Sequence, residues 1–268
     1  MKLKLLVLAL LVCPLVALAE FPSPRPYPAV VYKVEEIKQP VPQKIYIAAI
    51  DLTHPNVQVR VERGGDDPDG PGEWQTTLMQ PTKIADREGF DVVINGDFYA
   101  VGRAQSADGT TRPVKYEGGI AAKVSGPAVT DGEKWAVAGE PRAALLIGKN
   151  GKPAVAQLTD PPSDAEQVIA GSHVIVQNGR NVAPEDKPGF IRGPHPRTAV
   201  GIADGGKTLI LAVIDGRQKG EAVGMSLKET AEVMLKYGCT AAVNLDGGGS
   251  TMLGIRNPET GKMKIMNT

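Results

Sequence analysis

Turn signals recur so often in the middle of this chain that only short strands fit between them. From Ala100 to Pro194, Gly, Pro, Asn-Gly and Asp-Gly alternate with brief apolar runs, among them Ala143–Ile147 and His173–Val176. Asn-Gly and Asp-Gly adopt the backbone conformations that tight hairpin turns require. This spacing predicts a β-rich region with many loops.

A hairpin is expected early in the last third of the chain. Thr198–Ala203 and Thr208–Ile214 are two apolar runs, and Asp204-Gly205-Gly206 joins them. A short Asp/Gly segment between two strand-like runs is a hairpin signal.

A helix and a further strand are expected after this hairpin. Ser226 begins the helix, because Glu229 occupies the capping-box position three residues later. Gly238 ends the helix, and an apolar strand over Cys239–Leu245 follows. The residues of the apolar helix face are Leu227, Ala231 and Met234.

The region before Ala100 predicts strands and one interrupted helix. The helical pattern covers Thr76–Glu88, with a break or restart at Pro81 and a C-terminal cap at Gly89. The strands expected here are 44–52, 57–61 and 90–94. Together these elements indicate one α+β domain over residues 43–268, built from mixed β-sheets with a few flanking helices.

The first 42 residues are expected to lie outside that domain. Residues 1–19 combine a short basic head, an apolar run and a closing Ala-Leu-Ala, which is typical of a cleaved secretory signal. Prolines recur through residues 20–42 and favour an extended linker. We therefore predict an exported protein, periplasmic or extracellular, without stable membrane insertion after signal cleavage. Cys239 is then the only thiol of the mature chain.

The charge balance excludes one class of partner. The chain has 30 Lys and Arg against 30 Asp and Glu, so its formal net charge is zero. Nucleic-acid binders usually carry a strong basic excess. We therefore expect no nucleic-acid partner.

Three strands are expected to end in the same way, with a polar residue followed by glycine. The three strand ends are Asn95-Gly-Asp97, Asp215-Gly-Arg217 and Asn244-Leu-Asp246-Gly-Gly-Gly-Ser250-Thr251. Rigid strands position reactive groups well, and small residues admit a ligand. Each dipeptide taken alone also fits an ordinary turn. The third segment adds three glycines and two hydroxyls, whose N–H and O–H groups could hold an anion.

A fourth segment, His195-Pro-Arg197-Thr198, places a guanidinium at the entry to the predicted hairpin. Arg197 and Arg217 could clamp a phosphate, although either could equally pair with a surface carboxylate. Alternatively, Ser250 could be a nucleophile, with His195 and an Asp as its partners. However, the sequence around Ser250 lacks the G-x-S-x-G pattern of a nucleophile elbow.

The four segments in this order resemble the motif set of the phosphodiester glycosidase family. The resemblance covers roughly Ile45 to the C-terminal end of the sequence. It implies hydrolysis of the bond between an anomeric carbon and a phosphate oxygen in a sugar-phosphate or glycan substrate. The usual Asn-Gly-x-Phe-Phe of the family is Asn-Gly-Asp-Phe-Tyr here.

The resemblance also suggests roles for individual residues. Asp215 and Asp246 are candidates for the nucleophile or the water-activating base, and Asn95 and Asn244 would orient sugar hydroxyls or water. The predicted substrate-binding residues are Arg197, Arg217, Asp97, Thr198, Gly247, Gly248, Gly249, Ser250 and Thr251. No cofactor is certain, but a divalent cation, calcium or magnesium, held by Asp215 and Asp246 fits oxygen donors of this kind.

Two other functions remain open from the sequence. The same Arg and Asp groups could surround a metal and cut the P–O bond, as in a phosphodiesterase. Alternatively, the protein could be a noncatalytic envelope module that binds anionic glycans. Aromatic residues, which commonly stack on sugars, make up only 4% of the chain.

Overall fold

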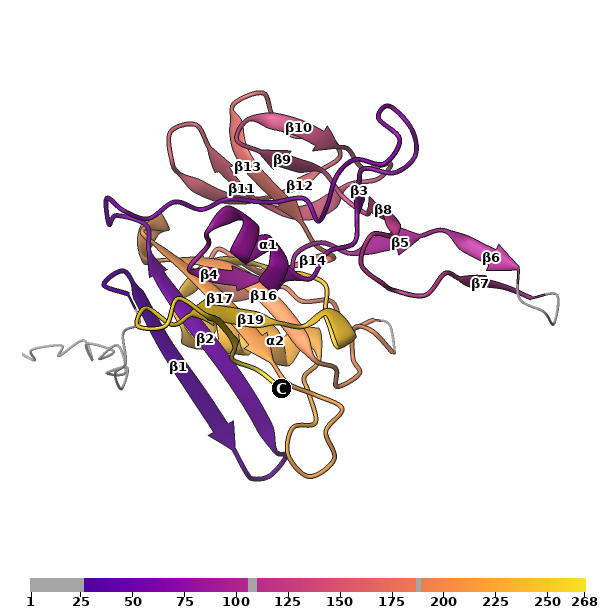
Figure 1. Cartoon of the computed structure of the whole chain (residues 1–268). Helices are drawn as coiled ribbons and strands as arrows, with labels where there is room; N and C mark the ends of the chain where they lie inside the picture. The colour runs from indigo at the N-terminus through magenta and orange to yellow at the C-terminus, as the bar shows by residue number, and fades with distance from the viewer. Residues whose placement is uncertain (1–26, 106–109, 187–188) are drawn as a thin grey trace, which may run out of the picture.

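An antiparallel sheet of seven strands forms the centre of the fold (Figure 1). The computed structural model describes residues 27–105, 110–186 and 189–268. The strand order in this main sheet is β1-β2-β17-β16-β18-β14-β15. Its strands are β1 (Val30–Ile37), β2 (Gln43–Asp51), β14 (His173–Gln177), β15 (Arg180–Asn181), β16 (Arg197–Ala203), β17 (Thr208–Ile214) and β18 (Cys239–Asn244).

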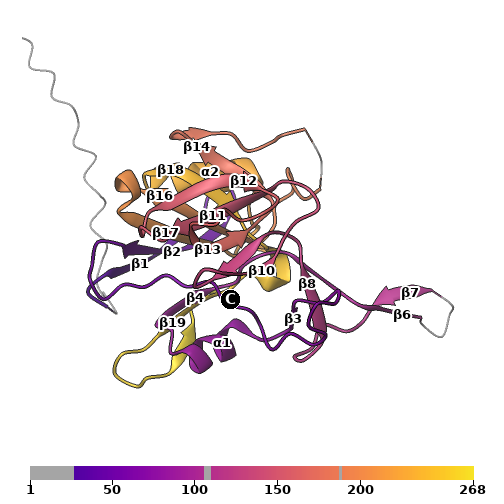
Figure 2. The ribbon, with the colours of Figure 1, turned by 90° about the horizontal axis from the view of Figure 1, so that it is seen from above.

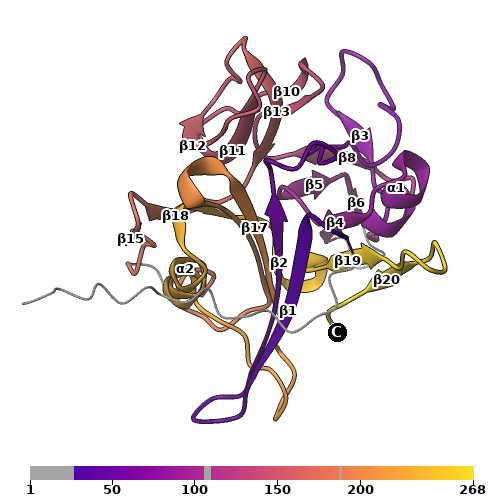
Figure 3. The ribbon, with the colours of Figure 1, turned by 90° about the vertical axis from the view of Figure 1, so that its left-hand side faces the viewer.

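The two faces of the main sheet carry different layers. Figure 3 shows helix α2 (Leu227–Lys236) on one side and the three-stranded sheet β20-β19-β4 with helix α1 (Pro81–Glu88) on the other. The strands of this small sheet are β4 (Val92–Ile94), β19 (Leu253–Arg256) and β20 (Met263–Ile265). Each face contributes its own apolar cluster, because side chains alternate between the faces along every strand.

A second antiparallel sheet lies against the end of the main sheet, as Figures 1 and 2 show. Its strand order is β10-β9-β13-β11-β12. Its strands are β9 (Ala128–Thr130), β10 (Glu133–Ala136), β11 (Arg142–Gly148), β12 (Pro153–Leu158) and β13 (Ala165–Ala170). The remaining strands are β3 (Thr76–Thr77), β5 (Tyr99–Val101) and β8 (Ala121–Val124) in one small sheet, and β6 (Arg103–Gln105) and β7 (Thr111–Pro113) in a projecting hairpin.

Locally encoded elements agree with the sequence predictions. Ser226 caps α2 through a complete capping box with Glu229. The predicted hairpin is formed by β16 and β17, with a short 3-10 turn over Asp204–Gly206 between them. The helix predicted over Thr76–Glu88 is shorter than expected, because Thr76–Thr77 is strand β3 and α1 begins at Pro81. Gly89 ends α1 with a left-handed backbone (φ 76°), as predicted. The described residues thus form one mostly β domain with two α-helices. The predicted α+β class assigned helices a larger share than they have.

Two predictions about the first 61 residues are wrong. Val30–Ile37 was assigned to the linker, but it is β1 and pairs with β2 over eight positions. Residues 57–61 were expected to form a strand, but they join no sheet. The backbone N–H of Val61 instead donates to Gln167 Oε1 (2.9 Å), and its carbonyl accepts from Thr130 Oγ1 (2.7 Å). Strand assignment depends on a partner, which a local pattern does not reveal.

Other N-terminal predictions remain untested. The predicted signal, residues 1–19, and the start of the linker, residues 20–26, lie outside the described residues. In the described part of the chain, no helix combines the length and apolar character that crossing a membrane requires.

Glu35 on β1 ties this edge strand to the end of α2. Its carboxylate accepts hydrogen bonds from Lys236 (2.6 Å) and Tyr237, and it lies 3.0 Å from Lys33 Nζ. Burial raises the pKa of Glu35, but the hydrogen bonds from Lys236, Tyr237 and Lys33 outweigh it and lower the pKa to about 2.

We expect Glu35→Gln to lower the free energy of unfolding by about 2 kcal/mol at pH 7. Because the folded pKa is depressed, this stabilisation is present above the unfolded pKa of 4.5 and is lost as the pH falls toward 2. Urea unfolding at pH 7 and at pH 3 measures the difference. The matched control is Glu36→Gln, whose exposed carboxylate lies 3.7 Å from Lys44 and should contribute less than about 0.5 kcal/mol. Equal losses in both variants would contradict this assignment.

Candidate functional site

Asn95 connects three separate parts of the chain beneath the candidate site. It follows β4, and its side chain is buried. Its Oδ1 accepts hydrogen bonds from Thr198 Oγ1 (2.7 Å) and from the N–H of Met252 (3.0 Å). Its Nδ2 donates to the carbonyl of Asp246 (2.8 Å). Asn95 and Thr198 were predicted to contact substrate. Their polar side-chain atoms instead form hydrogen bonds that position the glycine-rich turn.

Asp97 and Asp246 line one large cavity of about 1390 Å³, together with Ser250. Asp97 accepts hydrogen bonds from the N–H groups of Phe98 and Gly126, both at 2.7 Å. Burial raises the pKa of Asp97 to about 6, and the nearby charge of Asp246 acts in the same direction. Asp97 therefore changes its charge under mildly acidic conditions.

Asp246 begins the glycine-rich turn after β18. Its Oδ1 accepts from the N–H of Gly247 (2.8 Å). Burial raises the pKa of the Asp246 carboxyl, while hydrogen bonds from Ser250 and Gly247 oppose the shift. Burial and the Asp246 charge also raise the pKa of Tyr99, which lines the same cavity. Two carboxyls, a hydroxyl and a phenol thus converge on one space.

A smaller pocket of about 230 Å³ lies beside this turn and contains Asp215, Arg217 and Gly248. Arg217 is exposed and forms no ion pair with any residue in the described ranges. Its Nη2 lies 3.2 Å from His195 Nδ1. A Cβ on Gly248 would lie 3.2 Å from Arg217 Nη1, and the φ of Gly248 is +62°. Only glycine therefore lets the guanidinium lie over the turn without strain.

Asp215 is more enclosed than its place at a strand end suggested. Its side chain is 2% exposed, and Tyr46 donates to Oδ2 at 3.1 Å. Oδ1 accepts from Asn267 Nδ2 (3.4 Å) and from the N–H of Thr268 (3.2 Å). Asp246, whose burial is only partial, is consequently better placed than Asp215 to meet a substrate.

The two pockets share a wall formed by the turn and the last described residues. The residues that line both pockets are Gly249, Thr251, Asn267 and Thr268. The carboxylates of the large cavity and the guanidinium of the small pocket therefore lie on either side of one short segment. This arrangement suits a ligand with a neutral ring on one side and an anion on the other.

Arg197 lies in a different environment from the one predicted. Its side chain is 1% exposed and lines neither pocket. Nε donates to the carbonyl of Met225 (2.8 Å), and Nη2 donates to those of Phe190 (2.5 Å) and Gly193 (3.1 Å). Burial, followed by the charge of Arg217, lowers the pKa of Arg197 to about 10. These contacts make it an anchor for the 189–195 loop, because its Nε and Nη2 already donate to carbonyls and its side chain lines neither pocket.

The glycine turn itself offers fewer free N–H groups than predicted. Gly247 donates to Asp246 Oδ1, and Gly248 donates to the carbonyl of Pro196 (3.0 Å). Of the three glycines, only Gly249 has a backbone N–H group without a hydrogen bond to another described residue. The turn needs glycine for close packing as well, since a Cβ on Gly247 would lie 2.6 Å from the carbonyl oxygen of Pro196.

Asn244 lies inside the main sheet and lines neither pocket. Its Nδ2 donates to Ser172 Oγ (2.9 Å) and to the carbonyl of Leu245 (2.7 Å), and its side chain is 1% exposed. We therefore assign it to positioning β18 against β14. The alternative pairing of Ser250 with His195 also finds no support, because His195 contacts Arg217 instead.

The predicted divalent cation does not fit this arrangement. Asp215 and Asp246 line different pockets. Across residues 27–105, 110–186 and 189–268, no three His, Cys, Asp or Glu side chains gather as a metal would require. Because these two carboxylates line different pockets, they do not form the shared ligand pair that was predicted for calcium or magnesium.

Two tyrosines belong to the site without any sequence signal that marked them. Tyr46 lies within the apolar strand β2 and is 2% exposed. Tyr116 follows a loop, is 62% exposed and packs edge-on against Tyr99 with ring centroids 5.9 Å apart. Tyr116 lines the large cavity, and Tyr46 donates to Asp215 beside the small pocket, because the sheets bring distant segments together.

Solved structures with the same fold are distant in sequence. The catalytic domain of zebrafish N-acetylglucosamine-1-phosphodiester alpha-N-acetylglucosaminidase, auto-inhibited by its pro-peptide, matches with a TM-score of 0.62 and 20% identity, over 89% of this chain and 76% of that one. A Burkholderia pseudomallei protein named provisionally as exported matches with a TM-score of 0.55 and 18% identity, over 84% and 70%. At these identities the likeness shows the fold alone.

Family-level comparison is more specific than the structural one. A search of curated protein sequences finds no match. The family model for phosphodiester glycosidases, in contrast, matches residues 88–268, a range that contains all four predicted segments, including Asp97, Arg217 and Asp246. The chain therefore belongs to the phosphodiester glycosidase family.

Proposed function

We propose that this protein is an exported hydrolase that cleaves the glycosidic C–O bond of a sugar 1-phosphodiester. In this proposal the sugar lies beside Asp97 and Asp246, and the phosphate lies beside Arg217. Asp246 attacks the anomeric carbon or activates the water that does so. Phosphate leaves readily, so the stabilisation of its negative charge by Arg217 contributes more than protonation of the leaving oxygen.

The observation that carries this proposal is the shared wall between the two pockets. Two carboxyls with raised pKa values face one side of the glycine turn, and on the other side lies the exposed guanidinium of Arg217, which has no carboxylate partner among the described residues. Perturbed carboxyls gathered in a cleft are typical of catalytic sites. Tyr116, exposed at the rim of the large cavity, offers a ring on which a sugar can stack.

The test is the release of reducing sugar from an N-acetylglucosamine 1-phosphodiester by the protein lacking residues 1–19. The reaction is run in ¹⁸O-labelled water. Label in the sugar supports C–O cleavage, whereas label in the phosphate indicates a phosphodiesterase that cuts P–O. A folded protein that binds the diester without turnover on several sugars would instead be a glycan-binding module.

Arg217→Ala should raise KM for the diester by about tenfold or more, because a charge-assisted hydrogen bond contributes about 1.5–3 kcal/mol. The fold should tolerate the change, since Arg217 is exposed. Arg217→Gly is a sharper variant: the φ of Arg217 is +63°, so glycine should relieve strain and raise the thermal midpoint slightly while KM still rises. Steady-state kinetics and thermal unfolding separate the two effects. Lys219→Ala, an exposed charge in the same loop, is the control, and an equal KM change there would exclude a specific role for Arg217.

A further inference from the structure

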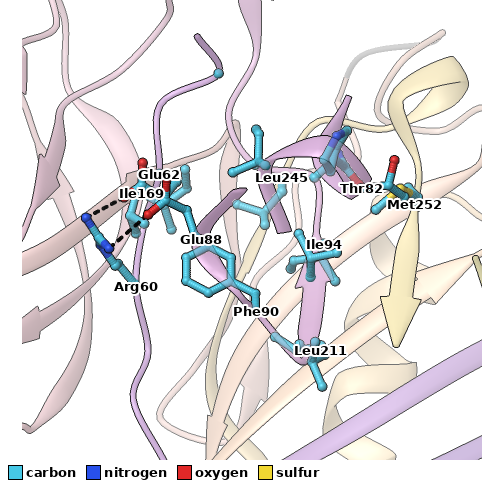
Figure 4. A pocket seen from close by; sticks show the side chains of 18 of the residues that line it. Arg60, Glu62, Thr82, Glu88, Phe90, Ile94, Ile169, Leu211, Leu245 and Met252 are labelled. Carbon is cyan, nitrogen blue, oxygen red and sulfur yellow. Dashed lines mark hydrogen bonds and ion pairs between the residues drawn. The ribbon is translucent and has the colours of Figure 1, made fainter. Parts of the chain in front are cut away.

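The large cavity extends well beyond Asp97 and Asp246 into the apolar interior. Figure 4 shows Phe90, Ile94, Leu211 and Leu245 around this space. Aliphatic side chains come from the main sheet, the second sheet and the β4 layer. The half-buried aliphatic lining residues that carry the argument are Val57, Val59, Val92, Ile94 and Ile169.

The size of this space exceeds what core packing leaves behind. Protein interiors hold few voids larger than a water molecule. Ligand pockets, in contrast, commonly measure about 300–1,000 Å³. The cavity here measures about 1390 Å³, and a single sugar ring at its carboxylate end would leave most of it unfilled.

The guanidinium of Arg60 on the cavity wall pairs with carboxylates of the chain itself. Arg60 lies 2.8 Å from Glu62 Oε1 and 3.2 Å from Glu88 Oε2, as the dashed lines in Figure 4 mark. These ion pairs need no charged ligand. The apolar part of the cavity also suits no sugar hydroxyl, because burying a polar group without a hydrogen-bond partner is unfavourable.

We propose that the substrate carries an aliphatic chain, which occupies this cavity while its sugar lies at the carboxylate end and its phosphate lies beside Arg217 at the shared wall. This proposal rests on the proposed function and adds a substrate class to it, a lipid-bearing sugar phosphodiester. The chain could come from a lipid alcohol esterified to the phosphate or from an acyl group on the sugar. Both sources present the same chemistry to the cavity wall.

The first experiment measures binding and requires no turnover. Ethyl, butyl, hexyl and octyl phosphate are titrated into the wild-type protein by calorimetry, below the concentrations at which they form micelles. Each methylene that enters the cavity should tighten binding by up to about fourfold. A dissociation constant that is the same for all four phosphates would overturn the proposal.

Two matched variants locate the chain. Val59 is half-buried and lines the cavity, whereas Val155 is half-buried and packs against the same apolar cluster outside it. Val59→Phe should weaken octyl phosphate binding about tenfold and leave ethyl phosphate unchanged. Val155→Phe should leave both unchanged, and an equal loss in both variants would place the chain elsewhere. If Val59→Phe does not fold, the wild-type chain-length series still decides.

The second experiment identifies the source of the chain. One pair of substrates compares octyl with ethyl esters of N-acetylglucosamine 1-phosphate, and the other compares N-octanoyl with N-acetyl sugars on the ethyl ester. If kcat/KM rises with chain length in the ester pair, the chain belongs to a lipid alcohol on the phosphate. If it rises in the N-acyl pair, the chain belongs to an acyl group on the sugar. Chain-length-dependent binding without hydrolysis of any substrate would refute the proposed function and leave the cavity assignment standing. Hydrolysis with the same kcat/KM for short and long chains in both pairs would support the proposed function and refute the cavity assignment.

Discussion

The Asp246→Asn variant is expected to lose about 10²- to 10⁴-fold in kcat for a sugar 1-phosphodiester. The carboxylate faces the large cavity, and the amide can neither attack an anomeric carbon nor take a proton from water. The fold should survive, because an amide oxygen can still accept the hydrogen bond from the N–H of Gly247. Sugar release and circular dichroism on the same preparation provide the measurement.

Two further aspartates make this prediction decisive. Asp91→Asn is the matched control, because Asp91 is exposed on the wall of the same cavity and should change kcat less than about threefold. Asp215→Asn tests the competing assignment. If Asp246→Asn keeps more than a tenth of the activity while Asp215→Asn is inactive, the reacting carboxylate is Asp215 and our assignment is wrong.

Activity is expected to fall by at least tenfold as the pH rises from 5 to 8, through the pKa of Asp97 at about 6. Ionised Asp97 adds a second negative charge near Asp246 and repels an anionic diester. The amide in Asp97→Asn resembles the protonated carboxyl, so this variant should show a flat profile over the same range. A profile of kcat/KM against pH for both proteins measures the effect. An activity that rises above pH 6 in the wild type would show that Asp97 acts as a base instead.

The same residue makes stability depend on pH in a defined direction. Burial raises the folded pKa of Asp97 above its ordinary value of 3.8. The stability linked to its protonated form is therefore fully present below pH 3.8 and is lost as the pH rises through about 6. Relative to Asp97→Asn, the wild type should lose on the order of 3 kcal/mol between pH 4 and pH 7. Urea unfolding at the two pH values checks this without any substrate.

The placement of Asp97 beside Asp246 shows why strand ends alone do not define a site. These residues are far apart in sequence, and β4 must pair with β19 before their turns can meet. Asn95 then fixes the contact by donating to the carbonyl of Asp246. Arg197 and Asn244 carry the same kinds of polar groups in similar segments, yet both are turned into the interior. Nothing local distinguishes a buried anchor from a binding group.

The edge of the main sheet illustrates the same limit for the fold. Val30 pairs with Ile50, and Ile37 pairs with Gln43, so β1 depends wholly on β2. The prolines around it made the segment look like a linker. Residues 57–61 show the reverse case. Their sequence alternates as a strand does, but no described strand lies beside them to pair with, and Val57 and Val59 pack on the apolar core instead.

The sequence by itself determined the elements whose hydrogen bonds close within a few residues. These are the capping box of α2, the Asp204–Gly206 hairpin and the Gly89 helix end. The sequence also marked the four segments that are typical of the family. Only the tertiary structure decided which of their side chains share a pocket, which carboxyl is accessible and how deep the cavity runs. The physical reason is that burial and charge proximity arise from contacts between segments 100 or more residues apart, such as Asn95 with Asp246 and Tyr46 with Asp215.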